Sequence, residues 1–303
     1  GRLSECGVEL EAFDPEEPGQ RAWILRADVC VDALFGVGLS REISPESDFA
    51  AAIHLINHCQ GTVISADISS GVEADTGRIL GCAVKADRTV TFTLAKPGHA
   101  VGDGALYAGD VTVWTIGIPE KRVKALTSRV QTVHETYARE ALPRRKEDGH
   151  KGTFGKVLVL AGSGAMCGAA VLCARAVLAS GAGMVKVVTE ERNRTPLFCA
   201  LPEAMADFWK EDEPLPEEAL LQDLAWADAG VAGPGLSKSR TAKELLVFTV
   251  QHTEVPLVLD ADALNLIAED AEILSGCRAE KILTPHVGEL ARLLHMTIAE
   301  CQR

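Results

Sequence analysis

The sequence predicts an α/β protein with two domains, each built around a mainly parallel sheet. Short, continuously apolar runs, such as residues 157–160, are typical of strands that are covered on both faces. Most of these runs end in a glycine turn or an acid and alternate with helix-forming stretches, and this order produces parallel pairing. The length of 303 residues is sufficient for two such domains.

The composition is that of an ordinary globular protein, with 47% hydrophobic and 24% charged residues. The net charge of -13 argues against nucleic acid and against an anionic membrane surface as partners. The nine cysteines form no CxxC motif, and several lie in apolar runs. They indicate buried free thiols in a reducing cytoplasm.

Four strands are expected in the first half of the chain, at residues 27–35, 62–68, 84–92 and 111–118. Helical periodicity at residues 49–59, with Asp48 near the start and Gly61 after the end, places a helix between the first two strands. Residues 132–142 are expected to form a short helix. The charged segment 143–149, bounded by Pro143 and Gly149, is the expected linker.

Two successive strands end in an aspartate beside a glycine turn, at Asp32 and Asp67. A single such carboxylate is often only a turn former, but two on neighbouring parallel strands favour a shared site at the carboxyl edge of the sheet. The oxygens of Asp32 and Ser70 suit a hard cation. Arg41 is either a phosphate contact or a solvated surface charge.

The second half repeats the alternation. Strands are expected at residues 157–160, 184–189, 229–232 and 282–286, and helices at 169–179, 216–226, 241–252 and 287–294. Residues 257–265 are expected to form a strand that runs into acids and then a helix. The strands end in residues able to bind a ligand: Ser163, Gly233 to Gly235, Asp260 with Asp262, Thr284 and His286. Four strand ends at one edge favour a site for a phosphorylated, hydroxyl-bearing ligand. The turn from Gly162 to Gly164 is either a phosphate cradle or a plain tight turn.

These motifs resemble the family of bifunctional NAD(P)H-hydrate repair enzymes. The first domain carries Val31 to Leu39, Asp67 to Gly71, Asp75 to Gly77 and Lys96 to Gly98. The second carries His150 to Gly155, Gly168 to Ala170, Gly181 to Gly183, Leu201 to Glu203, Gly233 to Gly235, Asp260 to Asn265 and Leu283 to His286. The resemblance covers nearly the whole chain, in the order of the family's two domains.

The resemblance implies a Rossmann-like epimerase domain at 1–142, represented by its carboxyl-terminal part, the linker at 143–149, and a ribokinase-like dehydratase domain at 150–303, represented by its amino-terminal part. The first would interconvert the R and S hydrates of NADH and NADPH. The second would use ADP, or ATP in some relatives, to dehydrate the S form. The implied cofactors are potassium and Mg²⁺, and we expect a cytoplasmic homo-oligomer.

The resemblance also assigns residues. Asp32 and Ser70 would bind potassium, and Asp67 would contact the hydrate and serve as acid or base. The other hydrate contacts in the first domain would be Gly36, Val37, Gly38, Leu39, Ser40, Arg41 and Glu42. In the second domain Cys173, Gly235 and His286 would line the hydrate site.

Two motifs of the family are missing from this sequence. The NNGGD loop of the epimerase domain and the GTGD turn of the dehydratase domain, whose aspartate is the family's catalytic base, do not occur. The chain therefore resembles the middle of the enzyme, with both active sites cut in half. We expect it to be inactive alone as a fragment, and in particular to lack dehydratase activity. Loss of the S hydrate in the presence of ADP and the purified chain would contradict this expectation.

Three alternatives remain open. Another ribokinase-like enzyme, such as a hydroxymethylpyrimidine-type kinase, would explain the second half but not Asp32 and Asp67. A non-enzymatic nucleotide- or protein-binding module would retain partner binding without binding potassium or the hydrate. A truncated product that folds poorly would expose sheet edges and aggregate.

Overall fold

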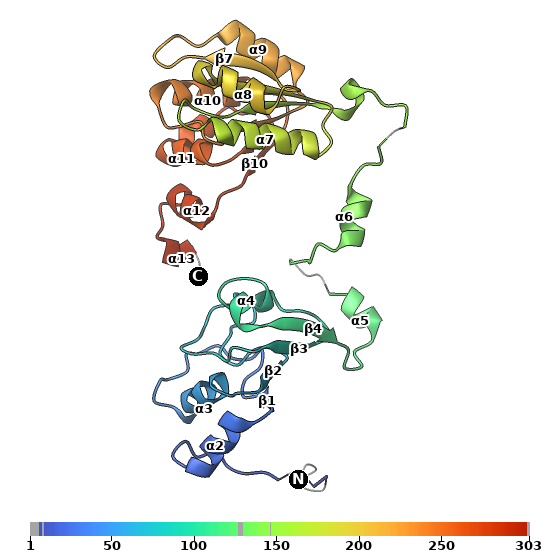
Figure 1. Ribbon diagram of the computed structural model, residues 1–303, viewed down its shortest axis with the longest axis vertical. Helices are drawn as coiled ribbons and strands as arrows, with labels where there is room; N and C mark the ends of the chain where they lie inside the picture. The colour runs from blue at the N-terminus through green and yellow to red at the C-terminus, as the bar shows by residue number, and fades with distance from the viewer. Residues whose placement is uncertain (1–5, 8, 127–129, 146, 302–303) are drawn as a thin grey trace. The chain divides into compact units, whose positions relative to one another are not determined.

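A computed structural model of the chain describes residues 6–7, 9–126, 130–145 and 147–301 (Figure 1). It forms two compact units, Gly1–Arg139 and Glu140–Arg303. Each unit contains one sheet in which every strand pair is parallel. The α/β class and the parallel sheets expected from the sequence are therefore confirmed. The division at residue 139 lies close to the linker predicted at 143–149, which the structure places within the second unit.

The sheet of the first unit has four strands in the order β1-β2-β3-β4. They are β1 (Val29–Asp32), β2 (Thr62–Ala66), β3 (Arg88–Phe92) and β4 (Asp110–Trp114). All four expected strands form, and each is shorter than the range expected for it. Parallel pairing brings the carboxyl ends of the strands to one edge.

Five helices of the first unit are described: α2 (Pro18–Arg26), α3 (Asp48–Asn57), α4 (Gly104–Tyr107), α5 (Glu120–Lys124) and α6 (Glu135–Ala141), which crosses the unit boundary. The expected helix at 49–59 is α3, and Ser47 caps it by accepting a hydrogen bond from Ala50 N. The sequence pattern does not predict α2. This helix buries no side chain, so it lacks the apolar periodicity on which such a prediction depends.

One face of the first sheet carries the core of the unit. Ile53 and Ile56 of α3 pack with Val63 of β2 and with Val84 on this face. Because side chains alternate along a strand, Val31 points to the other face, where it is 63% exposed. Asp32, the next residue, points to the covered face and is fully buried.

The sheet of the second unit has six strands in the order β10-β9-β8-β5-β6-β7. They are β5 (Lys156–Leu160), β6 (Met184–Glu190), β7 (Met205–Trp209), β8 (Ala229–Ala232), β9 (Leu257–Leu259) and β10 (Lys281–Leu283). The chain proceeds outward from β5 on both sides, so the strand order reverses between β5 and β8. Ligands of open α/β sheets bind in the crevice outside such a reversal, at the carboxyl ends of the strands.

Helices cover both faces of this second sheet (Figure 1). The described helices are α7 (Cys167–Ala179), α8 (Arg194–Ala200), α9 (Glu217–Trp226), α10 (Arg240–His252), α11 (Asp262–Glu269), α12 (Val287–Leu293) and α13 (Ile298–Cys301). Residues of α7 and α8 pack with Val159 and Val187 on one face. Residues of α9 and α10 pack with Leu158 and Leu160 on the other. The sequence pattern does not predict α8 and β7.

The described helices include none with the length and hydropathy of a membrane span. The nine cysteines are free, as expected. Their burial is less than expected, because Cys6 and Cys199 are exposed and the other seven are partly exposed.

A buried ion pair joins the second sheet to α9. The Lys186 ammonium contacts Asp223 Oδ1 and lies 3.3 Å from Asp207 Oδ2. The Asp223 side chain is only 2% exposed, and its Oδ2 has no hydrogen-bond partner. The lysine is thus the cation that compensates a carboxylate which water cannot reach.

We predict that Lys186→Met lowers the free energy of unfolding by about 3–5 kcal/mol, because it leaves the Asp223 charge buried and unpaired. Urea denaturation would measure the change. The double variant Lys186→Met/Asp223→Leu should recover most of the loss. Lys243→Met is the control, because its ion pair with Asp270 is about 40% exposed and is worth less than about 1 kcal/mol. Equal losses for Lys186→Met and Lys243→Met would contradict the prediction.

Candidate functional site

The carboxylate of Asp32 lies at the carboxyl edge of the first sheet and accepts four hydrogen bonds. Oδ1 accepts from Ser70 Oγ at 2.6 Å and from Leu34 N at 3.3 Å. Oδ2 accepts from Ser65 Oγ and from Ser70 N, both at 2.8 Å. The structure therefore brings together Asp32 and Ser70, the two residues predicted to bind a metal.

The donor atoms around Asp32 suit a hard cation. No lysine, arginine or histidine of the described residues forms an ion pair with this buried carboxylate, so its charge has only hydrogen bonds to offset it. The Ser70 hydroxyl lies 3.3 Å from the carbonyl oxygen of Phe35, which adds a third oxygen type. The described residues contain no cluster of three or more His, Cys, Asp or Glu side chains that could hold a metal ion. A carboxylate, a hydroxyl and a carbonyl fit an alkali or alkaline-earth ion better than a transition metal.

Asp67 follows β2 at the same edge and has a left-handed backbone, with φ of 68°. Its Oδ1 accepts hydrogen bonds from Phe92 N at 2.9 Å, from Thr91 Oγ1 at 3.1 Å and from the Lys96 ammonium. No hydrogen bond from a described residue reaches Oδ2, and 19% of the side chain is exposed. One carboxylate oxygen is thus held by the protein while the other remains available to a ligand.

The surroundings of Asp67 favour its ionised form. Burial raises the pKa of Asp67, but the hydrogen bond and charge of Lys96, with the N–H of Phe92, outweigh it and hold the pKa below its ordinary value. The carboxylate is therefore charged at neutral pH. It can accept a proton or stabilise a nearby cation, but it carries no proton to donate.

The imidazole of His99 contacts the backbones of both Lys96 and Asp67. Its Nδ1 accepts a hydrogen bond from Lys96 N at 3.2 Å, so the proton of the neutral ring lies on Nε2, 3.0 Å from the carbonyl oxygen of Asp67. Burial lowers the pKa of His99, which keeps the ring neutral. Neither His99 nor Lys96 has a role predicted from the sequence, although Lys96 opens the Lys-Pro-Gly motif after the third strand.

The predicted hydrate loop begins at this edge. Phe35 N donates to Ser70 Oγ at 2.9 Å, which anchors the chain just before the loop. Within the loop only Leu39 is partly buried; the exposed residues are Gly36, Val37, Gly38, Ser40, Arg41 and Glu42. Neither Arg41 nor Glu42 forms an ion pair with another described residue.

In the second unit the glycine turns meet at the reversal of strand order. Gly162 N donates to the carbonyl oxygen of Pro234 at 2.9 Å, which joins the turn after β5 to the turn after β8. Gly235 has φ of 63°, and a Cβ there would lie 2.7 Å from the Cβ of Ala169 in α7. Only glycine therefore allows this turn to pack on the first turns of α7.

The turn from Gly162 to Gly164 does not form an empty phosphate cradle. The Gly164 N–H donates to the carboxylate of Glu190, and Arg192 Nε lies 2.6 Å from the same carboxylate. Asn193 Nδ2 donates to the carbonyl oxygen of Ser163 at 3.1 Å. A protein carboxylate thus occupies the place of an anion, and the turn is a structural one.

Cys173 and Asp260 lie near each other in this unit. Burial, with the negative charge of Asp260, raises the pKa of Cys173 to about 11, so the thiol is neutral and is not a nucleophile at neutral pH. Thr284 Oγ1 donates to Asp260 Oδ1 at 2.8 Å, which connects the ends of β9 and β10.

His286 is the N-cap of α12. Its Nδ1 accepts from Gly288 N at 3.0 Å, and its Nε2 lies 3.3 Å from Glu289 Oε1. The imidazole is 68% exposed, so it can reach a ligand. No hydrogen bond or ion pair in the described part of the chain joins His286 to Cys173 or Gly235.

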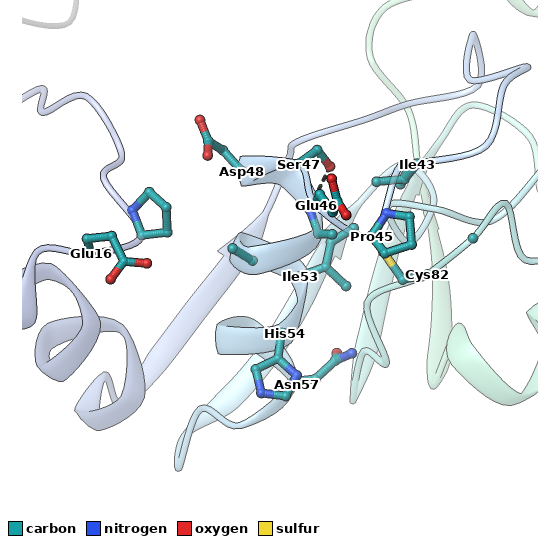
Figure 2. Close-up of a pocket in the computed structure, with 14 residues that line it drawn as sticks. Glu16, Ile43, Pro45, Glu46, Ser47, Asp48, Ile53, His54, Asn57 and Cys82 are labelled. Carbon is teal, nitrogen blue, oxygen red and sulfur yellow. Dashed lines mark hydrogen bonds between the residues drawn. The ribbon is translucent and has the colours of Figure 1, made fainter.

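A hollow of about 560 Å³ lies along α3 in the first unit (Figure 2). It is bordered by Ile43, Ser47 and His54, with Glu16 facing them from the segment before α2. None of the predicted site residues lines it. The hollow is therefore separate from the residues predicted to form the site at the sheet edge.

Comparisons with known proteins agree with the two-part architecture. A family model described as the YjeF-related protein N-terminus matches residues 1–98, and one described as NAD(P)H-hydrate dehydratase matches residues 157–303. A solved structure, the hypothetical protein SMU.573 of Streptococcus mutans, is 33% identical with a TM-score of 0.51. That match covers 56% of this chain and 60% of that one.

Two curated relatives align with almost the whole chain. The bifunctional NAD(P)H-hydrate repair enzyme Nnr of Moorella thermoacetica is 38% identical over 308 residues, covering 98% of this chain and 57% of that protein. The enzyme of the same name from Coxiella burnetii is 37% identical over 304 residues, covering 100% and 60%. The chain thus spans somewhat more than half the length of these relatives. With its YjeF-related domain followed by its NAD(P)H-hydrate dehydratase domain, the chain belongs to the family of bifunctional NAD(P)H-hydrate repair enzymes.

Proposed function

We propose that the chain acts in nicotinamide nucleotide repair. The first unit, a Rossmann-like epimerase domain, would interconvert the R and S hydrates of NADH and NADPH. The second, a ribokinase-like domain, would supply the hydrate side of an ADP-dependent dehydratase. The observation that carries the proposal is the ionised Asp67 carboxylate, with one free oxygen, at the same edge as the Asp32–Ser70 pair.

The chemistry of the hydrate explains why such a carboxylate is useful. Its hydroxyl is bonded to the carbon next to the ring nitrogen, whose lone pair can expel the hydroxyl and form a cationic ring. Addition of water to the opposite face of this ring inverts the centre. Asp67 would stabilise the cation and accept the proton of the attacking water through Oδ2.

Potassium would be held by Asp32 and Ser70, with the Phe35 carbonyl as a further oxygen. When bound, the ion would supply positive charge for the phosphates of the substrate. The hydrate contacts would come from the loop at 36–42, whose start is anchored to Ser70.

In the second unit, Cys173, Gly235 and His286 would line the hydrate site. ADP, or ATP in its place, with Mg²⁺ would phosphorylate the hydroxyl. Departure of this group as phosphate, with loss of the neighbouring proton, would restore the reduced ring. Because Glu190 occupies the turn from Gly162 to Gly164, the phosphates of the nucleotide would bind elsewhere.

The epimerase proposal is tested with the pure R hydrate of NADH in potassium buffer, by chromatographic measurement of the approach to the R/S equilibrium. Because Asp67 and the Asp32–Ser70 pair are assembled although the NNGGD loop does not occur, we propose, against the expectation from the sequence, that the chain accelerates it. Asp67→Asn should reduce the rate about 100-fold, the lower range for loss of an acid–base group. Asp75→Asn, in an exposed turn of the same unit, should leave it unchanged. The proposal fails if the unaltered chain gives no acceleration.

We predict that potassium stabilises the first unit, by about 2.7 kcal/mol at 100 times its dissociation constant. Thermal unfolding in potassium chloride and in tetramethylammonium chloride would measure this. Asp32→Asn should abolish the difference, because it removes the buried charge. Asp28→Asn, at the exposed opposite end of β1, should preserve it. A potassium effect that survives in Asp32→Asn would disprove this site.

For the second unit, we predict that His286→Asn weakens binding of the S hydrate about tenfold, the equivalent of one lost hydrogen bond. Asparagine keeps the N-cap of α12 but does not reach as far as the imidazole Nε2. Calorimetric titration would measure the affinity. His252→Asn, at the end of α10, is the control. Unchanged affinity in His286→Asn would exclude this residue from the hydrate site.

A further inference from the structure

Epimerisation of the hydrate needs a proton donor that the assignments above do not supply. The hydroxyl leaves readily only as water, so a group at the site must protonate it. Asp67 is ionised at neutral pH and cannot do so. The donor must therefore be another side chain within reach of the free oxygen of Asp67.

Lys96 has the required position and protons. Its ammonium donates to Asp67 Oδ1, to Thr91 Oγ1 at 2.8 Å and to the carbonyl oxygen of Phe92 at 3.3 Å. Its side chain is 17% exposed, so it is partly desolvated but open to a ligand. The bond to Phe92 is the longest of the three, and a substrate hydroxyl could replace it while the ion pair with Asp67 is retained.

The backbone holds the ammonium in place. The turn that Lys96 opens continues as the short helix Pro97–His99, and Gly98 N donates to the carbonyl oxygen of Ala74 at 2.7 Å. His99 accepts from Lys96 N and reaches the carbonyl oxygen of Asp67, so one ring fixes the backbones of both partners.

Other candidates for the donor do not satisfy the geometry. Both nitrogens of His99 are engaged with the backbone, and the residue is only 8% exposed. Arg41 has no hydrogen bond to the site within the described structure, and a guanidinium does not give up its proton.

We propose that Lys96 is the catalytic proton donor of the epimerisation and Asp67 the acceptor, with His99 as a positioning residue. This inference rests on the function proposed above. As the C–O bond breaks, the nitrogen lone pair forms a C=N bond, and a proton moves from Lys96 Nζ to the departing oxygen, which leaves as water. The planar cation then turns over so that its opposite face meets the same Lys96–Asp67 pair. A second water adds to that face, the π electrons return to nitrogen, and the extra proton of the added water passes to Asp67 Oδ2 and then to the Lys96 amine.

Arginine and methionine at position 96 separate proton donation from charge. Lys96→Met should lower kcat about 100-fold or more. Lys96→Arg keeps a cation beside Asp67 but cannot release a proton, so its kcat should also fall about 100-fold while KM changes less than about threefold. Lys85→Met, at an exposed lysine of the same unit, is the control and should match the unaltered chain.

These variants distinguish failure of the inference from failure of the function. If the unaltered chain epimerises the hydrate and Lys96→Arg does so at the same rate, Lys96 provides only charge and the inference is overturned. If the unaltered chain gives no acceleration, the proposed function itself fails, and the inference with it. Thermal unfolding of each variant shows whether a lost rate reflects a lost fold.

The positioning role of His99 has its own readout. His99→Gln retains a side-chain N–H that can donate to the carbonyl oxygen of Asp67, so its kcat should stay within about threefold of the unaltered chain. The kcat of His99→Ala should fall about tenfold, the equivalent of roughly one lost hydrogen bond.

The pH dependence of the rate tests the assignment of Asp67 as proton acceptor. Because the pKa of Asp67 is below its ordinary value near 4, the rate should persist down to about pH 4 and fall below it. A loss of rate already near pH 6 would overturn the assignment of Asp67 as acceptor.

Discussion

The buried carboxylate of Asp32 is the interaction on which the carboxyl edge of the first sheet depends. Its four hydrogen bonds join the end of β1 to β2, through Ser65, and to the turn at Ser70. Ser70 in turn accepts from Phe35 N at the start of the hydrate loop. The donors around a fully buried charge must stay in place, because each lost hydrogen bond to a charged group costs about 1.5–3 kcal/mol. Asp32 thereby fixes the edge beside which Asp67 lies.

The two units use strand-end acids in opposite ways. In the first, Asp67 has one oxygen held by Lys96, Thr91 and Phe92, and the other left for a ligand. In the second unit, the carboxylate of Glu190 accepts a hydrogen bond from Gly164 N and forms an ion pair with Arg192. The two carboxylates differ in their hydrogen-bond donors rather than in their chemistry. Among the described residues, the donors to Asp67 reach only Oδ1, whereas those to Glu190 reach both oxygens.

Much of the fold could be predicted from the sequence, because buried parallel strands leave short apolar runs such as 157–160 and 229–232. The helix α2 could not, because it buries no side chain and has no apolar stripe. Within the site, the pairing of Asp32 with Ser70 follows from the shared edge of parallel strands. The proposed roles of Lys96 and His99 could not be predicted, because they depend on a turn that folds back toward Asp67. The order of residues along the chain does not indicate this contact.

The charges at the first edge connect the proposed metal to the proposed substrate. Asp32 and Asp67 carry two negative charges there, Lys96 carries one positive charge, and His99 is neutral. Such an edge repels a dinucleotide, whose phosphates are negative. A cation held at Asp32 would cancel the excess, whereas a second lysine would compete with Lys96 for Asp67 and disturb its proton transfer. A metal cation is therefore suited to balance the negative charge of this edge, because it supplies positive charge but has no proton to exchange with Asp67.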